Sequence, residues 1–252
     1  MPLKPEIPSV IGRLLSELSW AGSTIREYRD GGRGFENVLT AEALQALDLL
    51  PRTHFLGNVV AHMHGADTAR QTLLQEVESA KFTLLPGNRY LRPRAASRET
   101  GIAVQPDAVL ESPSTYTIIE AKRLRRGSFQ PKQLAREFVL ALQRAEAKRP
   151  ILLLLLPEEP PVPVRGHGRR SISEAISLQL ADVLSDSDVP TASVAAALDG
   201  IDRVTCWITW QDLLAALTSR LATFEIHEPS VKASMARIVG TVQAAIEWHG
   251  DG

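Results

Sequence analysis

Six consecutive aliphatic residues, Ile151 to Leu156, constrain the fold of this 252-residue chain more than any other feature. A proline lies on each side of the run, and no polar side chain interrupts it. Because side chains alternate across a strand, such a run is typical of a β-strand that is covered on both faces. The run is far too short to cross a bilayer as a helix.

Helical and β-type patterns surround this strand. Apolar spacing predicts helices over residues 10–20, 35–50, 57–80 with a break near residue 65, 129–148, 171–184, 192–198, 210–221 and 230–248. β-type runs cover residues 81–85, 101–111, 115–124 and 203–209, and Ser112-Pro113-Ser114 predicts a hairpin connection. Residues 157–170 and the segment carrying Arg89, Arg92, Arg94 and Arg98 are expected to be loops. This order favours an α/β fold with a mixed central sheet flanked by helices.

Composition and charge narrow the function classes. A single cysteine excludes an internal disulfide, and the first residues lack the basic-then-apolar layout of a secretory signal, so we expect a cytoplasmic protein. The net charge of −1 argues against a generally basic nucleic-acid binder. Residues 120–149, however, hold nine Lys/Arg and three Asp/Glu. Residues 171–230, in contrast, hold two Lys/Arg and nine Asp/Glu. One face could therefore meet a polyanion.

The charged residues at the predicted hairpin indicate a site. Side chains alternate along a strand, so Glu120 and Lys122, two residues apart, share one face of the second strand. Asp107 comes from the first strand, just after Pro106, where a strand is easily splayed. Two nearby carboxylates repel each other unless a cation lies between them, and Mg²⁺ prefers such oxygen ligands. With Lys122 positioned to act on a metal-bound water, these groups predict a phosphodiester hydrolase.

The residues that follow Lys122 are basic and polar. Gln133 and Arg136 lie three apart on the next predicted helix, where they could brace the carboxylates or contact the substrate backbone. Three arginines, Arg123, Arg125 and Arg126, could contact phosphates that flank the scissile one.

Together Pro106-Asp107, Glu120-Ala121-Lys122 and a helix bearing Gln133-x-x-Arg136 resemble the PD-(D/E)xK, or restriction-endonuclease-like, nuclease superfamily. The resemblance implies a nuclease core over residues 35–221, preceded by a helical segment (1–34) and followed by a helix (222–252) that packs on it as part of one domain. It also implies that Asp107 and Glu120 bind Mg²⁺ or Mn²⁺ and that Lys122 assists the attacking water. Some members of the superfamily add a metal-binding glutamate from the first helix, which would be Glu36 here. We also assign a catalytic role to Gln133, from its place beside the carboxylates.

The function that this resemblance implies is a metal-dependent DNA endonuclease, with prokaryotic defence or restriction as its setting by analogy. We expect no membrane association, because the longest aliphatic run is too short to cross a bilayer. A homodimer and a larger defence complex remain open as assemblies. Two alternatives also remain open: an RNA nuclease, and a catalytically inactive protein of the same fold that binds nucleic acid or serves as a scaffold. Glycoside hydrolysis also uses paired carboxylates, but the adjacent lysine and basic flank fit phosphate better than sugar.

Overall fold

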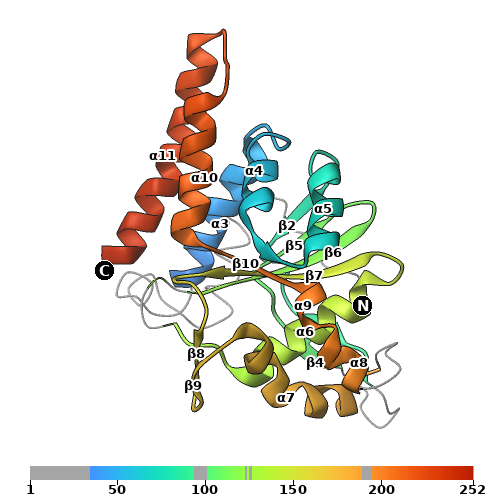
Figure 1. Ribbon diagram of the computed structural model, residues 1–252. Helices are drawn as coiled ribbons and strands as arrows, with labels where there is room; N and C mark the ends of the chain where they lie inside the picture. Colours follow the sequence, from blue (N-terminus) through green and yellow to red (C-terminus); the bar gives the residue numbers. More distant parts are fainter. Residues whose placement is uncertain (1–34, 94–100, 123, 125–126, 189–193, 252) are drawn as a thin grey trace, which may run out of the picture.

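The computed structural model describes residues 35–93, 101–122, 124, 127–188 and 194–251 (Figure 1). The helix predicted over residues 10–20 lies outside this described part. The described helices are α3 (Phe35–Leu49), α4 (Leu56–His62), α5 (Asp67–Glu76), α6 (Pro131–Ala145), α7 (Ile172–Asp186), α8 (Val194–Asp199), α9 (Ile201–Val204), α10 (Trp210–Thr223) and α11 (Pro229–Asp251). None of them is both long enough and apolar enough to span a membrane.

The central sheet has six strands in the order β1-β10-β7-β6-β5-β2. These strands are β1 (His64–Gly65), β2 (Lys81–Leu84), β5 (Ala108–Glu111), β6 (Thr115–Ala121), β7 (Arg149–Leu156) and β10 (Thr205–Thr209). β7 pairs in parallel with β6 and β10, whereas β1, β5 and β2 pair antiparallel with their neighbours. The sheet is therefore mixed, as the sequence predicts, and the aliphatic run lies at its centre.

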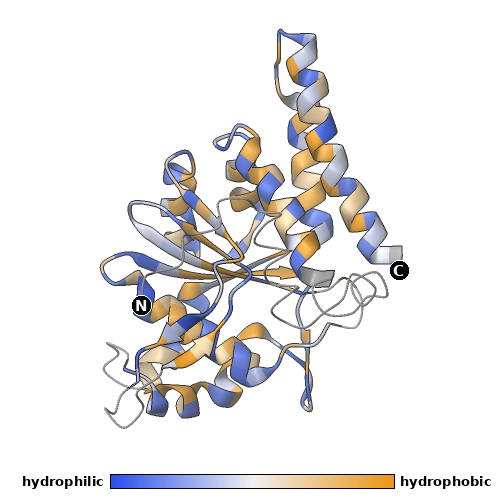
Figure 2. Ribbon diagram, turned by 180° about the vertical axis from the view of Figure 1, so that it is seen from behind, coloured by the Kyte–Doolittle hydropathy of each residue, from blue (hydrophilic) through white to orange (hydrophobic). Residues whose placement is uncertain are grey.

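Helices cover both faces of this sheet (Figure 1). On one face, Leu153 and Leu155 of β7 pack in a core with residues of α3, α4, α5, α10 and α11. On the other face, Leu152, Leu154 and Leu156 pack in a second core with residues of α6 and α7. The central strands are accordingly coloured as hydrophobic in Figure 2. The expectation of a strand buried on both faces is confirmed.

The turn of the hairpin between β5 and β6 is held by α5, one of the helices that pack on the same face of the sheet as Leu153 and Leu155. Ser112 Oγ donates to Glu76 Oε2 of α5 at 2.6 Å, and the Ser114 N–H donates to the same oxygen at 2.9 Å. These hydrogen bonds stabilise the carboxylate form and lower the pKa of Glu76. The turn predicted from Ser112-Pro113-Ser114 is thus confirmed, and it is anchored outside the sheet.

Most of the predicted elements are present, but three expectations are wrong. Residues 101–111 form two strands instead of one, because the chain breaks at residues 105–107 and β4 (Ile102–Val104) leaves the main sheet. The expected loop after β2 contains β3 (Arg89–Leu91), which pairs with β4. The expected loop over residues 157–170 contains a third pair, β8 (Val162–Val164) with β9 (Gly168–Arg170).

The C-terminal part of the chain follows the expected order with shifted boundaries. The capping box of α7 is present: Ser171 accepts from the Glu174 N–H, and Glu174 accepts from the Ser171 N–H. Arg203 belongs to α9 and not to the strand that follows. α11 packs against α3 and α10. Its buried residues include Met235, Val242 and Ala245, whereas Val231 is 47% exposed.

Leu154→Ala is expected to lower the free energy of unfolding by about 2–5 kcal/mol, because the side chain is fully buried on the central strand and its removal leaves a cavity. The matched control is Leu49→Ala. Leu49 is the last residue of α3 and is 64% exposed, so this change should alter the free energy of unfolding by about 0.5 kcal/mol or less. Urea unfolding followed by circular dichroism measures both. Equal effects would contradict the assignment of β7 as the centre of the core.

Candidate active site

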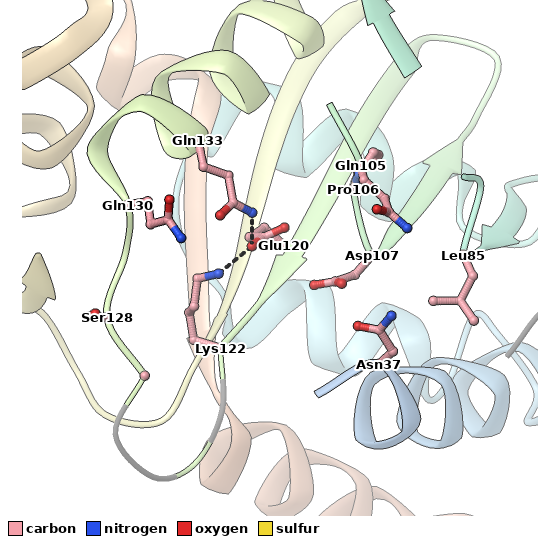
Figure 3. Close-up of a pocket in the computed structure, with 11 residues that line it drawn as sticks. Asn37, Leu85, Gln105, Pro106, Asp107, Glu120, Lys122, Ser128, Gln130 and Gln133 are labelled. Carbon is pink, nitrogen blue, oxygen red and sulfur yellow. Dashed lines mark hydrogen bonds and ion pairs between the residues drawn. The ribbon is translucent and has the colours of Figure 1, made fainter. Parts of the chain in front are cut away.

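A polar pocket of about 370 Å³ opens where β6 ends (Figure 3). It lies between the start of β5, the end of β6, the start of α6 and the start of α3. Its lining residues are Asn37, Leu85, Gln105, Pro106, Asp107, Glu120, Lys122, Gly127, Ser128, Gln130 and Gln133. Four of the residues singled out in the sequence, Asp107, Glu120, Lys122 and Gln133, therefore line one cavity.

Asp107 reaches this pocket through the hairpin, as the sequence predicts. Its N–H donates to Ile119 O at 3.1 Å, and the Ala121 N–H donates to Asp107 Oδ2 at 2.7 Å. The second bond continues the pairing of β5 and β6 with a side chain in place of a main-chain oxygen. It fixes one carboxylate oxygen on β6 and leaves the carboxylate directed toward the pocket (Figure 3).

Glu120 and Lys122 form a buried ion pair at the end of β6. Lys122 Nζ lies 2.5 Å from Glu120 Oε1, and the two side chains are only 11% and 4% exposed. Each charge would be strongly destabilising at this depth without the other. Alternation along the strand directs both side chains toward α6, whereas Ile119 and Ala121 belong to the core on the opposite face.

The main chain and the ammonium group of Lys122 are each held in place. Its N–H donates to Leu155 O of β7 at 2.9 Å, and its carbonyl accepts from Trp210 Nε1 at 2.9 Å. Trp210 is fully buried at the start of α10. The Nζ atom also lies 5.1 Å from the centroid of the Phe129 ring, within the range of a cation–π interaction. The lysine is therefore pre-positioned by three different elements.

Gln133 connects Glu120 to a second buried carboxyl group. Its Nε2 donates to Glu120 Oε1 at 2.9 Å and to Glu137 Oε1, one turn along α6, at 2.8 Å. Glu137 is completely buried. Burial raises its pKa well above the ordinary value, and the negative charge of Glu120 raises it further, while Lys122 and the Gln133 hydrogen bond act in the opposite direction.

Glu137 was missed by the sequence analysis, although the sequence contained a signal. It lies four residues after Gln133 and immediately before the buried Phe138, so helical geometry places it next to Gln133 on the side facing the sheet. Asn37 was also missed. It lies near Asp107 on the side of α3 that faces the pocket (Figure 3).

Of the remaining predicted site residues, only Arg136 has a described side chain. Arg123, Arg125 and Arg126 are outside the described residues, and the side chain of Glu36 is as well, although Glu36 itself belongs to α3. Arg136 is partly buried on α6 and does not line the pocket. The structure therefore brings the carboxylates, the lysine and the glutamine together and places Arg136 outside the pocket, whereas Arg123, Arg125, Arg126 and Glu36 stay predictions.

The donors in the pocket are of the kind that Mg²⁺ or Mn²⁺ prefers. Asp107 and Glu120 offer carboxylate oxygens, and Asn37 and Gln105 add amides. Magnesium often keeps several waters and needs only one or two carboxylates from the protein. Among the described residues, no group of three His, Cys, Asp or Glu side chains is arranged to hold a metal. Asp107 and Glu120 are the two carboxylates among the described residues that line this pocket.

Comparisons of the chain with protein-family profiles, with curated protein sequences and with solved structures gave no significant match.

Glu137→Gln is expected to make the protein less sensitive to rising pH. The unfolded chain ionises Glu137 near its ordinary pKa, whereas the folded protein holds the proton to higher pH, so wild-type stability falls as pH rises between the two values. Across that window, the free energy of unfolding of the variant relative to the wild type should rise by about 1.4 kcal/mol per pH unit. Urea unfolding at a series of pH values, in the presence of a chelator, measures the difference.

The control for this prediction is Glu247→Gln, on the exposed side of α11. It should leave the pH dependence of unfolding unchanged. Parallel curves for wild type and Glu137→Gln would show that Glu137 ionises alike in the folded and unfolded states.

Proposed function

We propose that this chain is a metal-dependent endonuclease of the PD-(D/E)xK superfamily that hydrolyses phosphodiester bonds in DNA. The observation that carries the proposal is the convergence of Asp107, Glu120 and Lys122 on one pocket, from the two strands of a hairpin. A mixed sheet with helices on both faces is compatible with the restriction-endonuclease-like arrangement. The prokaryotic defence setting rests on the resemblance alone.

In this proposal, Asp107 and Glu120 hold Mg²⁺ or Mn²⁺. The ion would supply a water of lowered pKa and would offset negative charge on the phosphate oxygens. Lys122 lies beside Glu120 with its Nζ 5.1 Å from the centroid of the Phe129 ring. Its role in this proposal is to stabilise the negative charge that develops as a water oxygen attacks phosphorus and the sugar oxygen leaves. Gln133 holds Glu120 in orientation through its amide N–H.

The Lys122–Glu120 pair sets a requirement on this chemistry. Glu120 Oε1 already accepts from both Lys122 Nζ and Gln133 Nε2. Metal binding through Oε1 would compete with these donors, so the other oxygen, Oε2, is the better ligand atom. Glu120 can then bind the ion and orient the lysine at the same time, and neither charge is left unpaired.

Asp107→Asn and Lys122→Met are expected to lower the rate of plasmid and linear DNA cleavage in Mg²⁺ or Mn²⁺ by about 100-fold or more, because each removes a group that acts on the transition state. The controls are Asp182→Asn on α7 and Lys232→Met on α11, which change the same groups at exposed positions. Cleavage should cease when the ions are removed with a chelator.

The proposal is wrong if the two pocket variants fold like the wild type and cut DNA as fast. Parallel assays on RNA of the same sequence identify the nucleic acid. Cleavage of RNA alone would replace the DNA assignment and keep the same residues.

A further inference from the structure

A small antiparallel ribbon lies beside α6, away from the main sheet. It consists of β3 and β4, with Arg89 opposite Val104, Tyr90 opposite Ala103, and Leu91 opposite Ile102. Leu91 and Val104 are buried in the core on the α6 face of the main sheet. The ribbon is therefore packed on its inner side, and alternation turns Tyr90 and Ala103 outward.

The outward face of the ribbon presents an uncovered aromatic ring. Tyr90 is 48% exposed, and the residue opposite it, Ala103, is exposed and has only a methyl side chain. A larger residue opposite Tyr90 would cover part of the ring, because directly opposed Cβ atoms lie about 4.5–5.5 Å apart. The small partner leaves the ring open to a flat ligand.

The ribbon leads directly into the proposed active site. β4 ends at Val104, and the next three residues, from Gln105 to Asp107, line the pocket. Gln105 is exposed and follows Ala103, the cross-strand partner of Tyr90, by two positions. Two residues of chain span at most about 7 Å. The outward face of the ribbon thus lies within a few residues of the pocket lining.

Positive charge accompanies the ring. The Arg92 side chain is 56% exposed and lies 3.4 Å from Glu146, whose side chain is 74% exposed; such an open pair contributes little and can yield to phosphate. Arg144 of α6 is exposed, and its Nη2 donates to Tyr90 O at 3.2 Å. This bond uses one of the five N–H groups of the guanidinium and ties the charge to the ribbon.

The ribbon is held rigidly enough to serve as a platform. The Arg92 N–H donates to Gln143 Oε1 at 2.9 Å, and Arg92 O accepts from the Asp188 N–H at 2.8 Å. Gly101 lies so close to Leu91 O that a Cβ at this position would be only 2.4 Å from it. These contacts fix Tyr90 before any ligand binds, so little ordering is required on binding.

We infer that the β3–β4 ribbon binds single-stranded nucleic acid next to the pocket, with an unpaired base stacked on Tyr90 and neighbouring phosphates on Arg92 and Arg144. The inference rests on the proposed function for the identity of the pocket. An aromatic ring beside cations is the arrangement with which proteins hold single strands, and it requires no particular base. In a duplex the faces of the bases are covered by their neighbours, so the substrate carries an unpaired segment at the cut.

Binding is tested with full-length protein carrying Asp107→Asn, in the presence of a chelator so that no cleavage occurs. The probes are a fluorescent single strand of about 15 nucleotides, within the usual range of site sizes, and a duplex of the same sequence. Tyr90→Ala should weaken single-strand binding about fivefold or more and duplex binding about twofold or less. Tyr90→Phe should retain both affinities, because it keeps the ring.

Two further measurements separate stacking from charge. A 2-aminopurine base in the single strand should change fluorescence on binding, and this change should be lost in Tyr90→Ala and kept in Tyr90→Phe. Arg92→Ala should weaken both probes and reduce the slope of log affinity against log salt by about one. Leu74→Ala, an exposed apolar change on α5 in the opposite helical layer, is the control and should alter nothing. Tyr90→Thr removes the ring but introduces a β-branched residue, which favours a strand, and repeats the test if Tyr90→Ala unfolds.

The inference is overturned if Tyr90→Ala binds the single strand like its parent or loses both probes equally. It is also overturned if an acidic peptide displaces the single strand as well as unlabelled DNA does. Failure of the nuclease proposal looks different, because wild-type protein would then cut no nucleic acid in Mg²⁺ or Mn²⁺ whereas Tyr90 would still govern binding. Conversely, if the wild type cuts DNA and Tyr90→Ala cuts unpaired substrates equally fast, the nuclease proposal stands and the ribbon has no part in it.

Discussion

Glu120 and Lys122 meet at the buried end of β6, and neither charge is tolerable there without the other. The surroundings of the pair serve that requirement. Gln133 supplies a further donor to Glu120, the Phe129 ring faces the ammonium group, and Trp210 fixes the main chain of Lys122. The position of α6 and the start of α10 are therefore tied to one ion pair as well as to the apolar cores. A polar pocket at the end of an otherwise apolar strand is the result.

The sequence predicted the parts of the molecule that depend on neighbours along the chain. The run from Ile151 to Leu156 reads as a buried strand because both of its faces are apolar. Asp107, Glu120 and Lys122 converge because a hairpin has a fixed alternation and a short turn. The proline before Asp107 marks the break between two sheets, although the strand ahead of it was expected to continue.

Features set by contacts between distant segments could not be predicted in the same way. β3 has three residues, too few for an alternating pattern, and its strand character comes from pairing with β4 over the core. The β character of β4 was predicted, but its departure from the main sheet was not. The position of Glu137, four residues after Gln133, was a local signal, but its complete burial depends on the packing of α6 on the sheet. Asn37 enters the pocket only because α3 lies beside the start of β5. The strand order likewise depends on pairing between segments far apart in the chain, such as β7 and β10.

One main-chain hydrogen bond joins the two points at which the chain leaves the main sheet for the ribbon and returns from it. The Leu85 N–H donates to Asp107 O at 2.9 Å, so the polypeptide leaves the main sheet after β2 and returns to it at nearly the same point. The number of residues between Leu85 and Asp107 therefore does not affect the register in which β2 and β5 pair. Such a segment can diverge in sequence and size while the carboxylates and lysine stay in place. The fold thus allows the ribbon to change independently of the side chains that line the pocket from β6 and α6.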